Sequence, residues 1–507
     1  MGGEVRVTNR VPVGIKVFYA AGASGEAIKN AAFAFLLIFY NQVLGLSGTA
    51  TGAALTIALV ADAIIDPAIG SWSDGMQTRY GRRHMLMGLA IIPLCLLVFG
   101  LFWPPEGLSD TALFIWLTVF TVGTRAALAV FHVPYLSLGA ELTQDYRERT
   151  QIAAARTGVG IFAAGVITQV IWLVIFAGKT GDASTGQLLR ENYFTIALMA
   201  ALSIGVLTTL CTFGTAPHIP KLAGSQQAPR PFSLIGMYRD IFEALGNRSF
   251  RALFVGTVIF FVYSGFQTAM GTHLMTFFWK LSSAAIGHIG LAGLTGAIIG
   301  LFLVPWFNRR FDKKWTVVIG VVASGALSTG PVVLNLFGLM PSDLHMLEIV
   351  LGVLGLFAAL IGVQASVTVA SMMGDIADEH ELKHGRRQEG IYFGSYAFSQ
   401  KCTTGLSTLV AGMAIDLIGL QPHADPHAVA PQIITNFGWA YALVALLLVF
   451  SVWVFLPYAL NKQRHDEVLR ALGVRNRERE DAEAALDTGP VRAAPLISGA
   501  PAFTAGD

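Results

Sequence analysis

Residues 60–83 read VADAIIDPAIGSWSDGMQTRYGRR, an apolar segment that carries two carboxylates and ends in a basic turn. Asp62 and Asp66 are four residues apart, which places both side chains on one face of a helix. An aspartate at the centre of a bilayer costs about 2.5 to 3.5 kcal/mol to insert. Two of them on adjacent turns need a bound cation, a proton or a basic partner, so this stretch predicts a cation or proton site.

The composition extends this interpretation to the whole chain. Of its 507 residues, 54% are hydrophobic and 13% are charged, and the mean hydropathy is +0.60. Soluble proteins carry about 25% charged residues, so the sequence predicts a polytopic membrane protein. The net charge of +2 gives no reason to expect nucleic acid as a partner.

Runs of about 20 apolar residues predict an all-α membrane protein with twelve transmembrane helices. We expect two pseudo-symmetric six-helix bundles, because a long hydrophilic connection separates the sixth helix from the seventh and the loops of the two halves resemble each other weakly. The predicted domains are a first bundle at residues 1–214, a cytoplasmic central loop at 215–248, a second bundle at 249–460 and a partly helical, then disordered, tail at 461–507. The predicted helices cover residues 14–45, 49–73, 84–103, 111–139, 153–177, 193–213, 250–279, 284–306, 314–338, 345–373, 389–419 and 435–459.

Basic residues gather in the even-numbered loops, as in the second loop with Arg79, Arg82 and Arg83. By the positive-inside rule, these loops and both termini are cytoplasmic. The first apolar run shows no cleavage site, so we expect it to be retained in a multi-pass protein of the cell inner (plasma) membrane. Cys95, Cys211 and Cys402 lack paired spacing, and we expect no disulfide, structural metal or organic cofactor.

The basic turn resembles the loop signature of the major facilitator superfamily, in which an aspartate and arginines latch the cytoplasmic helix ends. The alternative is a loop that only orients the helices in the membrane. The residues that carry this resemblance are Gly70, Asp74, Arg79, Gly81, Arg82 and Arg83.

Further motifs narrow the resemblance. The Asp62, Asp66 and Pro67 pattern is joined by VPY at 133–135, RERT at 147–150 and HELKHGRRQEGIYFGSYAFSQK at 380–401. Together these resemble the glycoside-pentoside-hexuronide:cation symporter family, typified by the melibiose carrier, over residues 10–460. HVPY at 132–135 also resembles the lysophosphatidylcholine transporter branch.

The resemblance implies that Asp62 and Asp66 bind the coupling cation and that Lys401 lies beside them. A buried ion triad that only holds the halves together is the alternative. Sodium-using family members add side-chain oxygens at two positions that here are Ile65 and Ala129. Hard cations need such oxygen ligands, so we favour a proton over sodium as the coupling ion.

For the substrate, the resemblance implies contacts from Glu26 on the first helix and Arg156 on the fifth. Two positions of the fourth helix depart from the sugar-binding pattern, because His132 and Leu136 replace an acidic and an aromatic residue. His132 is therefore expected either to contact the substrate or relay a proton, or to be a satisfied core histidine.

Three other polar residues at membrane depth are candidate substrate contacts. Lys29 follows Glu26 by three residues and alternatively pairs with it. Gln267 and Tyr396 lie in the middle of their predicted helices, and we expect both to face the cavity.

These observations predict a monomeric secondary active symporter that imports a small glycoside-like or sugar-derived solute by alternating access, and not an enzyme. The second candidate is a transporter of lysophospholipids or other amphiphiles. A membrane-embedded glycosyl or acyl transferase is the rival from another class, but no nucleophile with an adjacent base is visible. A non-transporting sensor would need a signalling domain.

Overall fold

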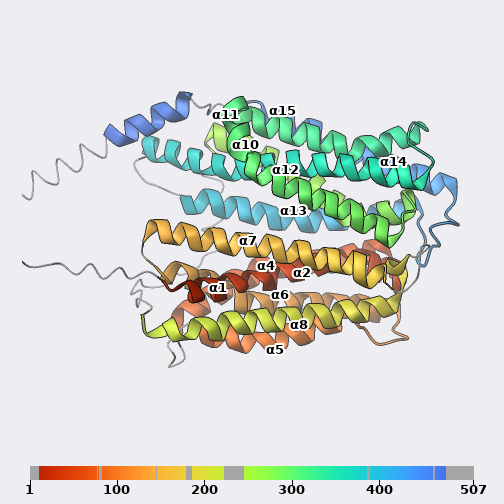
Figure 1. Ribbon diagram of the computed structural model, residues 1–507, viewed down its shortest axis with the longest axis horizontal. Helices are drawn as coiled ribbons and strands as arrows, with labels where there is room; N and C mark the ends of the chain where they lie inside the picture. The colour runs from red at the N-terminus through yellow and green to blue at the C-terminus, as the bar shows by residue number, and fades with distance from the viewer. Residues whose placement is uncertain are drawn as a thin grey trace, which may run out of the picture.

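The described part of the chain is entirely helical, and its long helices run side by side along the long axis of the molecule (Figure 1). Both described ends of the chain lie at the same end of the bundle, which we call the terminal end; the other is the closed end. The computed structural model describes residues 11–76, 78, 81, 83–143, 145–178, 185–221, 245–384, 389–458, 460 and 463–474.

The helices form two groups, called here the N-terminal half (residues 11–221) and the C-terminal half (245–460). The N-terminal half contains α1 (Val13–Ala21), α2 (Ala23–Phe33), α3 (Leu36–Ile38), η1 (Phe39–Val43), α4 (Gly48–Gly75), α5 (His84–Phe102), α6 (Asp110–Glu141), α7 (Tyr146–Val170), η2 (Ile171–Phe176), η4 (Gly186–Leu188), α8 (Arg190–Thr215) and η5 (Ala216–Lys221). The C-terminal half contains α10 (Arg248–His273), η6 (Leu274–Phe278), α11 (Ser283–Leu336), α12 (Leu344–His384), α13 (Glu389–Ile418), α14 (Pro431–Val444) and α15 (Leu446–Phe455).

Nine helices of the described residues are long and apolar enough to cross a membrane. One of them, α11, contains two passes, and the passes formed by α1 to η1 and by α13 complete twelve. The predicted fold class, twelve helical passes of the major facilitator type, is therefore confirmed. Most of the predicted central loop and of the tail lies outside the described residues, although residues 463–474 form the helix expected at the start of the tail.

One predicted boundary was wrong and another was confirmed. The first pass, expected as one helix, is interrupted at Gly22, where a Cβ would collide with the Tyr135 ring and with Cys211. The eighth and ninth passes are separate helices, as expected: the non-helical backbone of Asp312, with φ 60° and ψ 154°, forms the turn between them within α11. The Asp312 carboxylate accepts a hydrogen bond of 2.6 Å from the Lys313 amide, which stabilises this turn locally.

Polar residues just outside the apolar runs determine where several helices begin. The Ser47 hydroxyl accepts a hydrogen bond from the Ala50 amide at the start of α4. Asp145 and Asn247 cap α7 and α10 in the same way. These caps satisfy amide groups that have no partner within the helix.

The apolar core joins the two halves at one end only. The largest buried cluster includes Phe39 and Phe176 from the N-terminal half and Phe277 and Phe437 from the C-terminal half. Two smaller clusters are confined to one half each: one around Tyr135 and one around Met372 and Phe455.

Several polar contacts between the halves lie at the same end as the shared core. The Asp416 carboxylate of α13 accepts hydrogen bonds of 2.8 Å from the amides of Gly48 and Thr49 at the start of α4. Gln187 donates to Thr276 and accepts from Ser283. The closed end is therefore held by packing and by hydrogen bonds that cross between the halves.

Candidate functional site

A cavity of about 1150 Å³ lies between the halves. Side chains from α2, α4 and α6 form its wall in the N-terminal half, and side chains from α10, α11, α12 and α13 form its wall in the C-terminal half. Most of the wall is apolar, and the acidic and basic residues that line it are Glu26, Lys29, Asp62, Asp66, Arg125, His132 and Lys401.

Asp62 and Asp66 face this cavity from neighbouring turns of α4. The Lys401 ammonium, on α13 of the other half, lies 3.2 Å from Asp62 Oδ2 and also contacts Asp66 Oδ2. Asp62 is buried, whereas Asp66 retains 29% of its side-chain exposure. The structure thus brings the three residues of the expected coupling site together and places their ion pairs across the boundary between the halves.

Arg125 is a member of this cluster that the sequence analysis did not identify. Its Nη1 atom lies 3.3 Å from Asp62 Oδ2, and its guanidinium lies over the Phe33 ring at 5.5 Å from the centroid. An arginine in the middle of the apolar run 111–139 was itself a sufficient signal, because a charge at that depth needs a partner.

Glu26 and His132 form a second pair on the cavity wall, with 3.1 Å between Glu26 Oε2 and His132 Nε2. Lys29 does not pair with Glu26, so that alternative was wrong. Its ammonium lies over the Phe33 ring at 5.1 Å, and the residue is only 4% exposed.

Of the remaining expected substrate contacts, one lines the cavity and two do not. Gln267 lines the cavity and donates hydrogen bonds of 2.6 Å to Tyr263 and 2.9 Å to Thr329. Tyr396 packs against Phe261 in a small neighbouring pocket instead of lining the main cavity, so the expectation that it faces the cavity was wrong. Arg156 is not part of the cavity wall either; it lies beside Tyr19, within electrostatic range of Glu26.

The ligands available to a metal cation are few. Ala129 lines the cavity but offers no side-chain oxygen, and neither does Ile65 between the two aspartates. Among the residues that the structure describes, no three His, Cys, Asp or Glu side chains are grouped so that they could hold a metal ion.

Only part of the expected latch lies within the described residues: Arg79, Arg82 and the Asp74 side chain are outside them. Gly81 closes the turn with φ 85°, a conformation that favours glycine. Arg83 donates to Ser73 at 2.7 Å and pairs with Glu141 at 3.1 Å, so it ties the ends of α4 and α6 to the start of α5.

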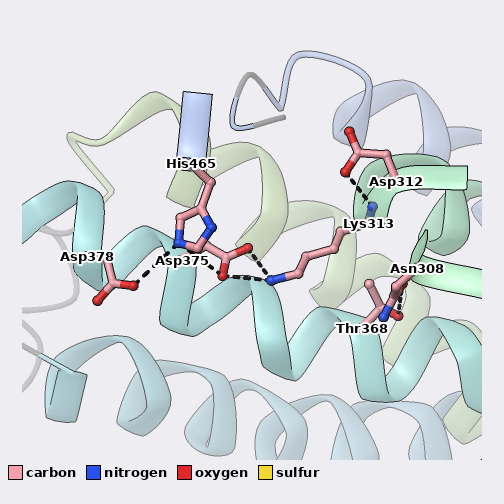
Figure 2. Close-up of polar contacts among 7 residues, drawn as sticks. All are labelled: Asn308, Asp312, Lys313, Thr368, Asp375, Asp378 and His465. Carbon is pink, nitrogen blue, oxygen red and sulfur yellow. Dashed lines mark hydrogen bonds and ion pairs between the residues drawn. The ribbon is translucent and has the colours of Figure 1, made fainter. Parts of the chain in front are cut away.

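A second polar cluster lies in the C-terminal half (Figure 2). Lys313 donates to both carboxylate oxygens of Asp375, at 2.8 and 2.7 Å. His465 of the tail helix lies 3.5 Å from Asp375 and 3.4 Å from Asp378. Burial, and then the charges of Asp375 and Glu379, raise the pKa of the nearby Tyr458 hydroxyl.

Comparison with known proteins finds relatives that match most of the chain. The isoprimeverose transporter of Lactiplantibacillus pentosus is 24% identical over 426 residues, covering 82% of this chain and 83% of that protein. The sodium-dependent lysophosphatidylcholine symporter 1 of Gallus gallus is 24% identical over 495 residues, covering 91% and 89%. The crystal structure of the nucleoside transporter NupG shares the fold with a TM-score of 0.58 at 15% identity, covering 88% of this chain and 98% of that one.

The sequence profile of the family described as MFS/sugar transport protein matches residues 18–462, nearly the whole chain. The chain therefore belongs to this family of glycoside-pentoside-hexuronide:cation symporters and is a multi-pass secondary transporter, not an enzyme.

Proposed function

We propose that this protein is a proton-coupled symporter that imports a small glycoside-like or sugar-derived solute. The observation that carries the proposal is the contact of one ammonium, Lys401, with two carboxylates, Asp62 and Asp66, from the opposite half. Neutralising either carboxylate weakens a link between the halves. Proton binding therefore changes the relative stability of the states that transport requires.

The donor set favours a proton as the coupling ion. Asp62 already contacts two cationic side chains, Arg125 and Lys401, and no side-chain oxygen of Ile65 or Ala129 supplements the carboxylates. Sodium and similar hard cations are selected by the number and geometry of oxygen ligands. A proton needs only one carboxylate oxygen.

Alternating access follows from the distribution of contacts. The shared core and the Asp416 hydrogen bonds close one end of the boundary between the halves. With the basic loops in the cytoplasm, the closed end faces outward, and the cavity is loaded or emptied from the cytoplasmic, terminal end. We place the protein in the inner (plasma) membrane as a monomer.

A sugar-derived substrate is supported by the named function of the isoprimeverose transporter and by polar groups on the cavity wall, including Glu26, His132 and Gln267. A lysophospholipid is the second candidate. It is supported by the similarity to the lysophosphatidylcholine symporter and by the largely apolar wall, which includes Phe260 and Phe261.

The test uses purified protein in proteoliposomes with imposed gradients of protons or sodium and a panel of labelled glycosides and lysophospholipids. We expect an inward proton gradient to drive accumulation of a glycoside, and Asp62→Asn to abolish it. Asp110→Asn, at the exposed start of α6, is the matched control and should accumulate normally. Full accumulation by Asp62→Asn, or accumulation driven by sodium at fixed pH, contradicts the proposal.

A further inference from the structure

Lys29 is a buried ammonium group that forms no direct ion pair with any described residue. It is 4% exposed, yet it belongs to the cavity wall. Within the described chain, no carboxylate lies within 4.0 Å of its ammonium, and the Phe33 ring is its cation–π partner. Buried ammonium groups are normally paired, since an unpaired charge away from water is costly.

The neighbouring carboxylates are already engaged. Asp62 contacts Arg125 and Lys401, Asp66 contacts Lys401, and Glu26 contacts His132. Arg125 lies over the same Phe33 ring as Lys29, and its Nε atom has no hydrogen-bond partner. Two cations therefore meet at one place on the wall, and only one of them has a carboxylate partner.

The charges on the cavity wall balance only while all three of its carboxylates are ionised. Three carboxylates, Glu26, Asp62 and Asp66, face three cations, Lys29, Arg125 and Lys401, with His132 as a further titratable group. Arg156 stands behind this wall, beside Tyr19. When one aspartate binds a proton, the wall acquires one positive charge in excess.

We propose that Lys29, with Arg125 beside it, forms an anion subsite for a solute that carries a single carboxylate or phosphate group. This inference rests on the proposed symport and adds a coupling mechanism to it. The bound anion neutralises the charge that protonation leaves in excess, and each ligand therefore increases the affinity for the other. A neutral sugar of the same shape lacks this effect.

The experiment measures binding to purified full-length protein by thermal shift and calorimetry, without any gradient. The probes are methyl glucoside, methyl glucuronide, glucose 6-phosphate and, to test a lipid source of the anion, lysophosphatidylcholine against monoacylglycerol. We expect at least one anionic probe to bind about tenfold tighter than its neutral counterpart, as a charge-assisted hydrogen bond allows. Its affinity should rise as the pH falls from 8 to 6.

Three variants distinguish the loss of the anion subsite from a general loss of folding or binding. Lys29→Met should remove the anion preference, so that the anionic and neutral probes bind with equal affinity, while Lys29→Arg should retain the preference. Lys314→Met, at a lysine that donates to the Leu456 carbonyl, is the control outside the cavity. If Lys29→Met fails to fold, the preference of Lys29→Arg and the pH dependence of the wild type still decide the question.

Equal affinity for neutral and anionic probes, no binding of any anionic probe, or an unchanged preference in Lys29→Met overturns the subsite. Proton-driven uptake of a neutral glycoside without anion preference would leave the proposed function standing and refute the subsite. Anion preference without any effect of a proton gradient on uptake would leave the anion subsite standing and refute the proposed proton coupling.

Discussion

Asp62 has the largest number of charged partners among the cavity carboxylates. Arg125 approaches it from α6 and Lys401 from α13, at 3.3 and 3.2 Å. Asp66, one turn further along α4, contacts Lys401 and stays more exposed. The two aspartates are therefore unequal: Asp62 anchors two cations, and Asp66 is more accessible to a proton that enters from the cavity.

Arg125 offers a test of whether the site favours a proton over sodium. In the triple variant Arg125→Gln, Ile65→Asn and Ala129→Thr, Asp62 loses one cationic partner and two side-chain oxygens are added beside the carboxylates. We expect sodium to stimulate uptake by this variant at fixed pH, because the site then offers more oxygen ligands and less positive charge. Initial uptake rates in proteoliposomes with and without sodium measure the effect.

Two controls belong to this experiment. The double variant Ile65→Asn and Ala129→Thr retains Arg125 and should respond less to sodium. Ile64→Asn places the same side chain on an exposed face, away from the aspartates, and should not respond. A sodium response of equal size in all variants would mean that Arg125 and the two oxygens do not decide the coupling ion.

Helices α4 and α13 contact each other both at the candidate site and at the closed end of the bundle. Near the closed end, a Cβ on Gly412 of α13 would collide with the Gly48 carbonyl of α4. Further along the same pair of helices, Lys401 meets Asp62 and Asp66. A change in the angle between these two helices therefore alters the closed end and the ion pairs together.

Gly412→Ala should shift the equilibrium away from the closed-end conformation. The added methyl group forces the two helices apart at a cost of about 1 to 3 kcal/mol, which is typical of overpacking. A cysteine introduced at Thr408, which lines the cavity, reports the change in a background without the native cysteines. We expect an impermeant thiol reagent to label it more slowly from the terminal end and faster from the opposite end.

Gly394→Ala, on the same helix, is the matched control because a Cβ there meets no other atom within 4 Å. Unchanged labelling rates in Gly412→Ala would show that this close approach does not control the closed end.

In each half of the molecule, an ion pair links two helices near their ends. In the N-terminal half, Arg83 pairs with Glu141; in the C-terminal half, Lys313 pairs with Asp375, and His465 of the tail helix joins the cluster (Figure 2). These pairs hold each half together as a unit. The contacts that cross between the halves lie elsewhere, at Lys401 and at the closed end.

Asp375→Asn should destabilise the protein by about 2 kcal/mol, because it leaves the Lys313 ammonium without its charge partner. His465→Ala should cost less, about 1 kcal/mol, since His465 makes longer contacts with two carboxylates. Thermal unfolding of the purified protein in detergent measures both effects. Asp425→Asn, at an exposed position, should leave the unfolding temperature unchanged. Equal temperatures for all three variants would show that the Lys313–Asp375 pair and His465 do not stabilise the protein.

The residues that could be recognised from the sequence are those whose environment is set by position along one helix. Asp62 and Asp66 had to share a face because of their spacing, and a lysine within the eleventh apolar run had to find a carboxylate. The number of passes followed from hydrophobic length.

The contacts that only the tertiary structure decided are those between helices: Arg125 with Asp62, the absence of a carboxylate at Lys29, and the packing of Tyr396 in a side pocket instead of the cavity. Membrane helices are apolar around most of their circumference, so a hydrophobic pattern does not show which face meets which neighbour. Crossing angles and the closeness allowed by small residues such as Gly412 determine those neighbours. The sequence alone therefore determined that the chain crosses the membrane twelve times and places charged residues at membrane depth on α4 and α13, while the packing of the two halves determined which charges are paired.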